Sequence, residues 1–138
     1  MIHFIAIDVT LPEILGWSQK DWIARVINHF GMKTGEVFFL FCTDDYLLQI
    51  NNDYLQHDTF TDIITFDLSE NKHFISGEII ISLDRVLDNS NRFKVDFAEE
   101  IHRVLIHGIL HLLGFKDKTD EESALMRAQE NYCLSLRS

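Results

Sequence analysis

The sequence predicts a single α+β domain, in which a mixed sheet of about four strands packs with four or five helices. Two kinds of segment support this prediction: short runs rich in β-branched and aromatic residues, and longer segments whose apolar residues recur at helical spacing. The length of 138 residues suits one domain with one core. No repeat, low-complexity segment or linker marks a boundary, so residues 1–138 are expected to form one domain.

Four segments are predicted to be strands, namely 2–9, 36–42, 62–68 and 77–82. The run EVFFLFC at 36–42 is continuously apolar, which is typical of a buried central strand. The chain start is expected to be a strand and not a signal peptide, because its apolar residues lack a basic flank. No long uncharged apolar stretch is present, so no membrane span is expected.

Helices are expected between and after these strands. Ser18–Asp21 has the form of a capping box, and Gly31 is placed to end the first helix. A second helix is expected from Thr43 to about residue 55, and a short third one at 83–89, followed by a loop at 89–96. Asp96 with Glu99 is expected to cap a long apolar helix, and Thr119–Glu122 to cap a last helix that ends near residue 135.

The long helix carries the sequence HGILHLLGFKD, residues 107–117. Residues four apart on an α-helix are offset by about 40° and about 6 Å, so His107 and His111 point the same way. Two imidazoles at this spacing can bind one metal ion. Asp117 follows a glycine that can end the helix in the left-handed conformation, so the chain can return toward the two imidazoles. His107, His111 and Asp117 are therefore the expected ligands of one Zn²⁺ or another divalent transition metal.

A structural interpretation of the same residues is that each histidine bonds a backbone carbonyl or a carboxylate. Gly108 weakens it, because a glycine in mid-helix costs about 1 kcal/mol and suggests that something approaches closely there. Gly108 also excludes one familiar class of metalloenzyme. In the HExxH peptidases this position holds the glutamate that acts as general base.

HGILHLLGFKD resembles the signature HGxLHLxGYDH of the YbeY family of metal-dependent endoribonucleases and rRNA maturation factors. INNDYLQHDTFTDIITFDL and GEIIIS are similar to further segments of this family, so the resemblance covers about residues 45–117. The sequence departs from the family at Asp117, where histidine is usual, and at Lys116, Leu55 and Glu78, where the family has aspartate, arginine and aspartate. A carboxylate at Asp117 still suits zinc, whereas a phosphate contact by the missing arginine cannot be carried over to Leu55.

The resemblance implies a zinc-dependent, single-strand-specific endoribonuclease in the cytoplasm. It would process the 3′ end of small-subunit rRNA and act in ribosome quality control, with rRNA and ribosomal particles or a ribosomal protein as partners. No DNA partner is expected. Two alternatives remain open: a ribosome-assembly factor with a structural metal and little nuclease activity, and a metallohydrolase with another class of substrate.

The catalytic residues are not assigned from the sequence. Asp62 and Glu78 are candidates for a general base only because they lie at strand ends in the segments that resemble the family. The favoured interpretation of both is structural, with Asp62 as a turn or capping residue and Glu78 as a solvated strand end. Glu100 lies seven residues before His107 and within about 20° of it on the helix, so it is a candidate partner for an imidazole. A solvated first-turn glutamate favoured by the helix dipole is an equally good interpretation of it. His102 points elsewhere, about 140° away. The remaining histidines have no metal-ligand spacing and are interpreted as ordinary ones, namely His3, His29, His57 and His73.

The net charge of −10 argues against a broad electrostatic contact with nucleic acid, although a local patch remains open. The basic residues Arg85, Arg92, Lys94 and Arg103 lie close in sequence, and an ordinary solvated face is the favoured interpretation of them. Phenylalanines could stack on unpaired bases, and five of them lie along the relevant half of the chain, namely Phe60, Phe66, Phe74, Phe93 and Phe97. Most of the eleven phenylalanines are expected in the core, so none is singled out. Cys42 and Cys133 are expected to be reduced thiols.

Overall fold

The computed structural model describes residues 1–55 and 61–137, without the side chains of residues 54 and 55. The predictions for the side chain of Leu55, for His57 and for Phe60 therefore lie outside the described residues. The elements follow in the order β1 (Ile2–Ala6), α1 (Trp17–His29), β2 (Lys33–Cys42), α2 (Asp44–Leu55), β3 (Ile63–Asp67), β4 (Phe74–Ser82), α3 (Leu83–Phe93), α4 (Phe97–Leu112) and α5 (Asp120–Ser135).

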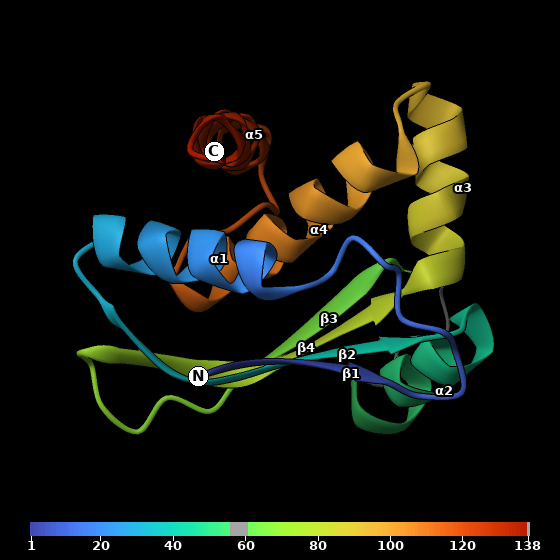
Figure 1. Cartoon of the computed structure of the whole chain (residues 1–138), viewed down its shortest axis with the longest axis horizontal. Helices are drawn as coiled ribbons and strands as arrows, with labels where there is room; N and C mark the ends of the chain where they lie inside the picture. Colours follow the sequence, from blue (N-terminus) through green and yellow to red (C-terminus); the bar gives the residue numbers. More distant parts are fainter. Residues whose placement is uncertain (56–60, 138) are drawn as a thin grey trace.

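The strands form one mixed sheet in the order β1-β2-β4-β3. β1 pairs with β2 and β2 with β4 in parallel, whereas β3 pairs antiparallel with β4. Helices α1 and α4 cover one face of the sheet, α2 lies against the other, and α5 lies outside α4 (Figure 1). The predicted α+β class and mixed sheet are confirmed.

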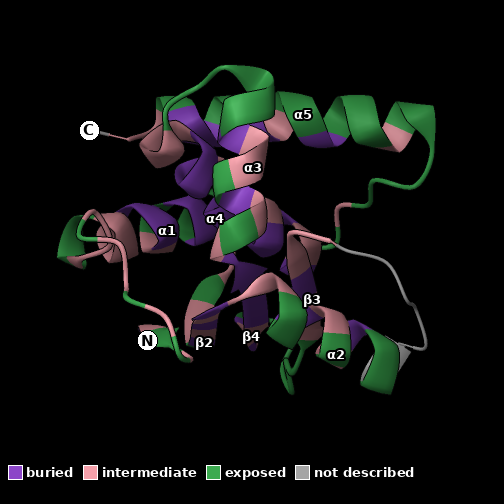
Figure 2. Ribbon diagram, turned by 90° about the vertical axis from the view of Figure 1, so that its right-hand side faces the viewer, coloured by how far each residue is buried: buried purple, intermediate pink, exposed green. Residues whose placement is uncertain are grey.

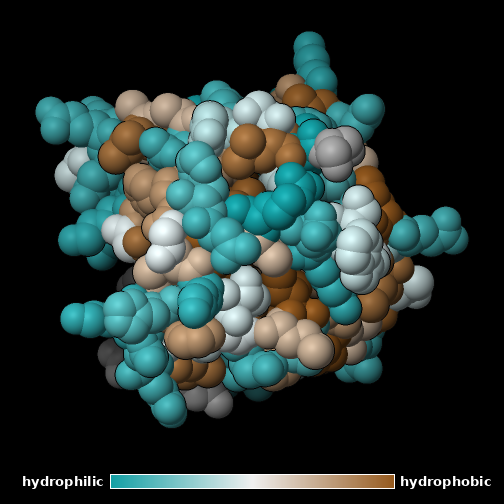
Figure 3. Space-filling view, turned by 60° about the vertical axis from the view of Figure 1, so that its left-hand side comes forward, coloured by the Kyte–Doolittle hydropathy of each residue, from teal (hydrophilic) through white to brown (hydrophobic). Residues whose placement is uncertain are grey.

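Helix α4 lies in the middle of these layers, and most of its length is buried (Figure 2). Its burial follows from its sequence, because apolar residues occupy nearly all sides of the helix. On the molecular face displayed in Figure 3, by contrast, hydrophilic and hydrophobic side chains are interspersed. Within residues 1–55 and 61–137, no helix has the length and hydropathy needed to span a membrane.

Glycine lets α4 lie close to the sheet. A Cβ atom on Gly108 would come within 2.7 Å of Ile79 Cγ2 on β4 and 3.0 Å of Ile63 Cδ1 on β3. Gly77 on β4 makes a second close approach, since a Cβ there would lie 3.0 Å from a methyl group of Leu112. The close approach expected at Gly108 is therefore confirmed, and what approaches it is the sheet. This packing fixes the height of α4 above β3 and β4.

Several predicted boundaries are wrong. β2 and β4 each begin three residues earlier than expected, because Lys33 and Thr34 pair with Phe74 and Ile75. The loop expected at 89–96 is mostly helix, since α3 continues to Phe93 and ends where Lys94 takes the left-handed conformation, with φ of 57°. β1 is shorter than predicted and ends at Ala6.

The helix caps are partly as predicted. The box at Thr119 and Glu122 is confirmed, with both reciprocal hydrogen bonds. The box expected at Ser18 is wrong, because α1 already begins at Trp17 and Gln19 accepts a hydrogen bond from the Gly16 N–H. Asp96 does occupy the N-cap position of α4, but its side chain makes no capping hydrogen bond.

Candidate metal centre

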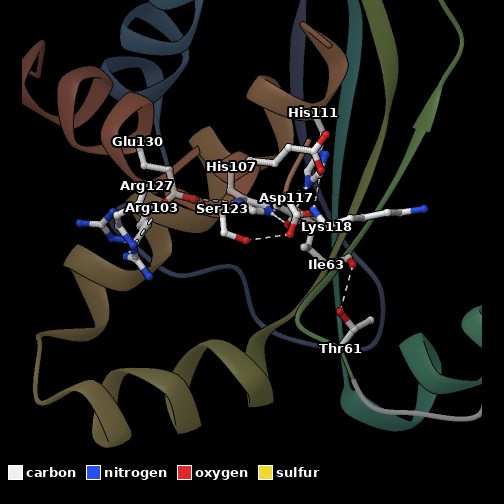
Figure 4. Close-up of polar contacts among 11 residues, drawn as sticks. Thr61, Ile63, Arg103, His107, His111, Asp117, Lys118, Ser123, Arg127 and Glu130 are labelled. Carbon is white, nitrogen blue, oxygen red and sulfur yellow. Dashed lines mark hydrogen bonds and ion pairs between the residues drawn. The ribbon is translucent and has the colours of Figure 1, made fainter. Parts of the chain in front are cut away.

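Three side chains converge at the end of α4, namely His107, His111 and Asp117 (Figure 4). The Nε2 atoms of the two imidazoles lie 3.0 Å apart. Oδ2 of Asp117 lies 3.3 Å from Nε2 of His107 and 3.4 Å from Nε2 of His111. The structure thus brings together all three residues that the sequence singled out as ligands.

This triangle of atoms fits a zinc ion. Tetrahedral zinc binds nitrogen and oxygen ligands at about 2.0–2.2 Å, which puts any two ligand atoms about 3.3–3.5 Å apart. The two distances from Asp117, 3.3 and 3.4 Å, fall in this range. The distance between the two imidazole nitrogens, 3.0 Å, is 0.3 Å below its lower end. Two nitrogens and one carboxylate oxygen are also a ligand set that zinc accepts. The residues present therefore fit the metal that the family resemblance implies.

Asp117 reaches the imidazoles because the chain reverses directly after α4. The N–H of Gly114 donates to the carbonyl of His111, and the N–H of Phe115 donates to that of Leu110. These two bonds form a Schellman motif, which requires a left-handed residue and explains the φ of +103° at Gly114. Asp117 is then held from α5, where the hydroxyl of Ser123 donates to its backbone carbonyl at 2.8 Å (Figure 4).

Glu130 on α5 is a residue of the site that the sequence analysis missed. Its Oε2 accepts a hydrogen bond from Nδ1–H of His107 at 2.7 Å, and its Oε1 accepts one from Arg103 at 2.9 Å. With Nδ1 protonated, Nε2 of a neutral His107 carries the lone pair that a metal needs. The sequence does mark Glu130, because this glutamate interrupts the apolar face that α5 forms with Met126, Cys133 and Leu134.

The pKa of His107 is set by two opposing influences, namely its burial and the negative charges around it. Burial lowers the pKa of His107 and is the largest single influence, but the hydrogen bond and charge of Glu130, with Asp62 and Asp117, bring the net pKa above its ordinary value. Burial, with the neighbouring His107, lowers the pKa of His111. For Glu130, burial acts to raise the pKa, yet the hydrogen bonds from His107 and Arg103 hold it below its usual value. Glu130 is therefore a carboxylate at neutral pH, which acts only as an acceptor.

The two candidate general bases lie on different sides of the sheet. Asp62 lines a cavity together with His107 and Asp117. Glu78 lines a separate pocket with Tyr46 and Ile50 of α2, on the face of the sheet that is turned away from α4. Side chains alternate between the two faces of a strand, and Ile79 is the residue that contacts α4. Glu78 therefore points away from the three converging residues, and its position does not support a role as their general base.

Glu100 and His102 belong to α4 but do not contact the three converging residues through any described hydrogen bond. Glu100 is buried and lines the same cavity as Asp62, whose charge adds to the burial that raises the pKa of Glu100. Glu100 is therefore neither a solvated glutamate nor a hydrogen-bond partner of His107, and that partner is Glu130. As predicted, His102 points elsewhere, and its Nδ1–H donates to the carbonyl of Ala98 at 2.6 Å.

The remaining described histidines lie away from the centre. His3 pairs with Glu36 at 2.8 Å, His29 lies against the rings of Phe30 and Tyr132, and His73 lies beside the start of β4. None of them joins the group of three within the described part of the chain.

Comparison with known proteins gives the same assignment as the sequence signature. The family model described as "Endoribonuclease YbeY" matches residues 12–137. The chain belongs to the endoribonuclease YbeY family. A YbeY relative from Parabacteroides distasonis is 45% identical over 135 residues, which cover 98% of this chain and 94% of that protein. A YbeY relative from Cytophaga hutchinsonii is 49% identical over 118 residues, which cover 86% and 82%.

A solved structure supports the fold. The solution structure of a protein from Thermotoga maritima matches with a TM-score of 0.68 and 24% identity, covering 99% of this chain and 88% of the other. The predicted resemblance to the YbeY family is confirmed, and membership favours an RNA-cleaving hydrolase over an assembly factor with little nuclease activity.

Proposed function

We propose that this chain is a zinc-dependent endoribonuclease that cuts single-stranded segments of ribosomal RNA, with the 3′ end of small-subunit rRNA as its substrate. The observation that carries the zinc assignment is the triangle of His107 Nε2, His111 Nε2 and Asp117 Oδ2, with sides of 3.0, 3.3 and 3.4 Å. The RNA substrate is supported by the name that the YbeY relatives share. We further propose that the protein acts in the cytoplasm and binds ribosomal particles or a ribosomal protein.

Zinc, when bound, would lower the pKa of a water molecule and polarise a phosphoryl oxygen of the RNA. The protein's own contribution is to hold the ligands ready. Glu130 keeps the proton of His107 on Nδ1, and Arg103 keeps Glu130 in its charged form. Such partners fix the orientation of an imidazole and raise its basicity toward a metal.

Asp62 is the proposed acceptor for the proton of the attacking group. Its carboxyl group lines the same cavity as His107 and Asp117. Burial raises the pKa of Asp62 above its ordinary value. A general base works best when its pKa lies near the working pH, so this direction favours the role. The attacking group is either a water molecule or the ribose 2′-hydroxyl, and the products identify which.

The test compares wild type with Asp117→Ala and Asp62→Asn on a single-stranded RNA and on the same RNA annealed to its complement. Zinc-loaded wild type should cut only the single strand, and Asp62→Asn should retain zinc but cut about 100-fold or more slowly, within the range for a lost general base. A 2′,3′-cyclic phosphate at the new end would identify the 2′-hydroxyl as the attacking group, whereas a 5′-phosphate would identify water.

Specific outcomes would refute the proposal. If zinc-loaded wild type leaves single-stranded RNA intact, the chain is not the proposed nuclease. If Asp62→Asn cuts at the wild-type rate, Asp62 is not the base. The ribosomal part is tested separately, by sedimentation with small-subunit particles purified from cells that lack the protein. If the protein does not sediment with small-subunit particles whose rRNA has an unprocessed 3′ end, the ribosomal part of the proposal is refuted.

A further inference from the structure

A solvent-open cavity of about 260 Å³ adjoins the metal centre. Two of the proposed ligands, His107 and Asp117, line it. Arg103 and Arg127 also line it, together with Asn89 and Phe93 of α3. An RNA strand whose scissile phosphate lies at the metal centre would have its neighbouring nucleotide in or beside this cavity.

The two arginines of the cavity differ in what they bind. Arg103 is held on both sides, since its two terminal nitrogens donate to Glu130 and Asn131 at 2.9 Å each. Arg127 only approaches Glu130, at 3.6 Å, which is beyond hydrogen-bond length, and 59% of its side chain is exposed. Arg127 can therefore bind an incoming anion without first breaking a strong bond.

Arg127 is also the better placed of the two arginines to contact a phosphate near His107 and Asp117. It lines the 260 Å³ cavity and a second hollow of about 180 Å³, and both hollows are bounded by His107 and Asp117. Figure 4 shows Arg103 and Arg127 side by side, on the side of His107 that faces away from His111. A guanidinium group binds phosphate through two parallel hydrogen bonds, which makes Arg127 suited to a phosphodiester.

Phe93 contributes an aromatic ring to the lining of the cavity. It is the last residue of α3, and 55% of it is exposed although it is a large apolar side chain. The guanidinium group of Arg92 lies 5.9 Å from the centre of its ring. Exposed aromatic rings flanked by cations are the usual means by which proteins bind unpaired bases.

The electrostatics of the chain restrict RNA contact to a few places. With a net charge of −10, most of the surface repels a polyanion, and Asp62, Glu100 and Glu130 put negative charge in the cavity itself. Arg103 and Arg127 offset part of this charge, and a bound divalent metal would offset two further charges. Contact with the RNA backbone therefore depends strongly on single cationic side chains.

We infer that this cavity is the nucleotide-binding subsite beside the metal centre, in which Arg127 binds an RNA phosphate and Phe93 stacks on an unpaired base. The inference deepens the proposed nuclease function and rests on it. It also explains why an acidic protein keeps an exposed arginine and an exposed phenylalanine in the lining of this cavity. Arg103 acts here as a positioning residue, because it reaches the site through Glu130.

The test measures binding of a fluorescent 2′-O-methyl oligouridylate, checked on a gel for integrity, to zinc-loaded protein across a series of salt concentrations. Loss of one phosphate contact from single-stranded nucleic acid reduces the slope of log K against log salt by about 0.7. Arg127→Gln should show this reduction with an unchanged zinc content. The matched control is Arg25→Gln on α1, which removes the same charge where the side chain pairs with Asp21.

Phe93 is tested by affinity and by rescue. Phe93→Leu should weaken binding about 5- to 150-fold, the range for one lost base stack, and leave the salt slope unchanged. Phe93→Tyr should restore most of the affinity, because the ring and not the apolar bulk is required. The matched control is Phe74→Leu, which removes another exposed phenylalanine at the far end of β4.

The outcomes separate the subsite from the nuclease proposal. Wild-type protein that binds and cuts RNA, with Arg127→Gln and Phe93→Leu indistinguishable from it, would overturn the subsite alone. Equal losses in Arg127→Gln and Arg25→Gln would also overturn it, because the effect would then be net charge. Wild-type protein that neither binds nor cuts RNA would overturn both proposals.

Discussion

Glu130 on α5 accepts a hydrogen bond of 2.7 Å from Nδ1–H of His107 on α4, 23 residues earlier in the chain. This contact orients the imidazole whose Nε2 faces His111 and Asp117. It also makes the candidate metal centre depend on how α5 packs against α4, since Ser123 of α5 holds the backbone of Asp117 as well. Two helices and the turn between them therefore build one site.

Replacing Glu130 by glutamine should weaken zinc binding. The change keeps the size of the side chain but removes the charge that holds the proton of His107, and loss of such a partner typically costs about 10- to 100-fold in metal affinity. Competition with a fluorescent zinc chelator measures it. Glu99→Gln is the matched control, because Glu99 also pairs with an arginine, Arg137, away from the centre. Equal zinc affinities for Glu130→Gln and wild type would contradict the proposed role.

Replacing Gly114 by alanine should reduce both stability and zinc affinity. A residue with a Cβ is strained at φ of +103°, at a cost of about 1–3 kcal/mol, and relief of this strain would move Asp117. Gly31 provides the control, because its φ is +81° and a Cβ at either glycine would have no atom of the described residues within 4 Å. Gly31→Ala should lower the free energy of unfolding by a similar amount and leave zinc affinity unchanged. A similar loss of zinc in both variants would argue that the turn has no specific role.

His102 should make the protein less stable at mildly acidic pH. Burial lowers the pKa of this imidazole, with the charges of Arg137 and Glu99 acting in opposite directions on it. Below the unfolded-state pKa of about 6.5, the unfolded chain binds a proton that the folded chain resists, so the free energy of unfolding falls as the pH falls toward the folded-state pKa. Urea titrations of wild type and His102→Gln between pH 8 and 5 would measure this. The decline should be steeper in wild type, and parallel curves would contradict the prediction.

Both cysteines should be unreactive in the folded protein. Burial raises the pKa of the Cys42 thiol to about 12 and that of Cys133 to about 11, so the thiolate form is scarce at neutral pH. A thiol reagent that absorbs light on reaction should detect neither cysteine at pH 8 and both of them in guanidinium chloride. Rapid reaction of one thiol in the folded protein would contradict this prediction.

The sequence was sufficient for the features that depend on local interactions. The helical spacing of His107 and His111 is set by the helix itself, and Gly114 signals the turn that returns Asp117. Gly108 correctly indicated a close approach, although only the structure identifies Ile79 as the neighbour. The histidine spacing and the turn could be predicted because each one spans no more than about two helical turns.

The remaining features depend on packing between distant segments. Glu130 was missed because its partner lies on another helix. Glu78 remained a candidate base because a strand pattern does not say which face of the sheet α4 covers. The continuation of α3 to Phe93 was also missed. The segment NSNRF lacks apolar periodicity, and its helix is supported by burial of Ser90, whose hydroxyl donates to the carbonyl of Leu87.

The central claim is that His107, His111 and Asp117 together hold one zinc ion. Its most direct test is elemental analysis of protein purified without a histidine tag, for wild type, His111→Ala and Asp117→Ala. Wild type should hold about one zinc per chain, with three protein ligands and an open position, and both variants should lose most of it. Folded wild-type protein that holds no metal even after zinc is added would contradict the claim, and full zinc retention by Asp117→Ala would remove Asp117 from the centre.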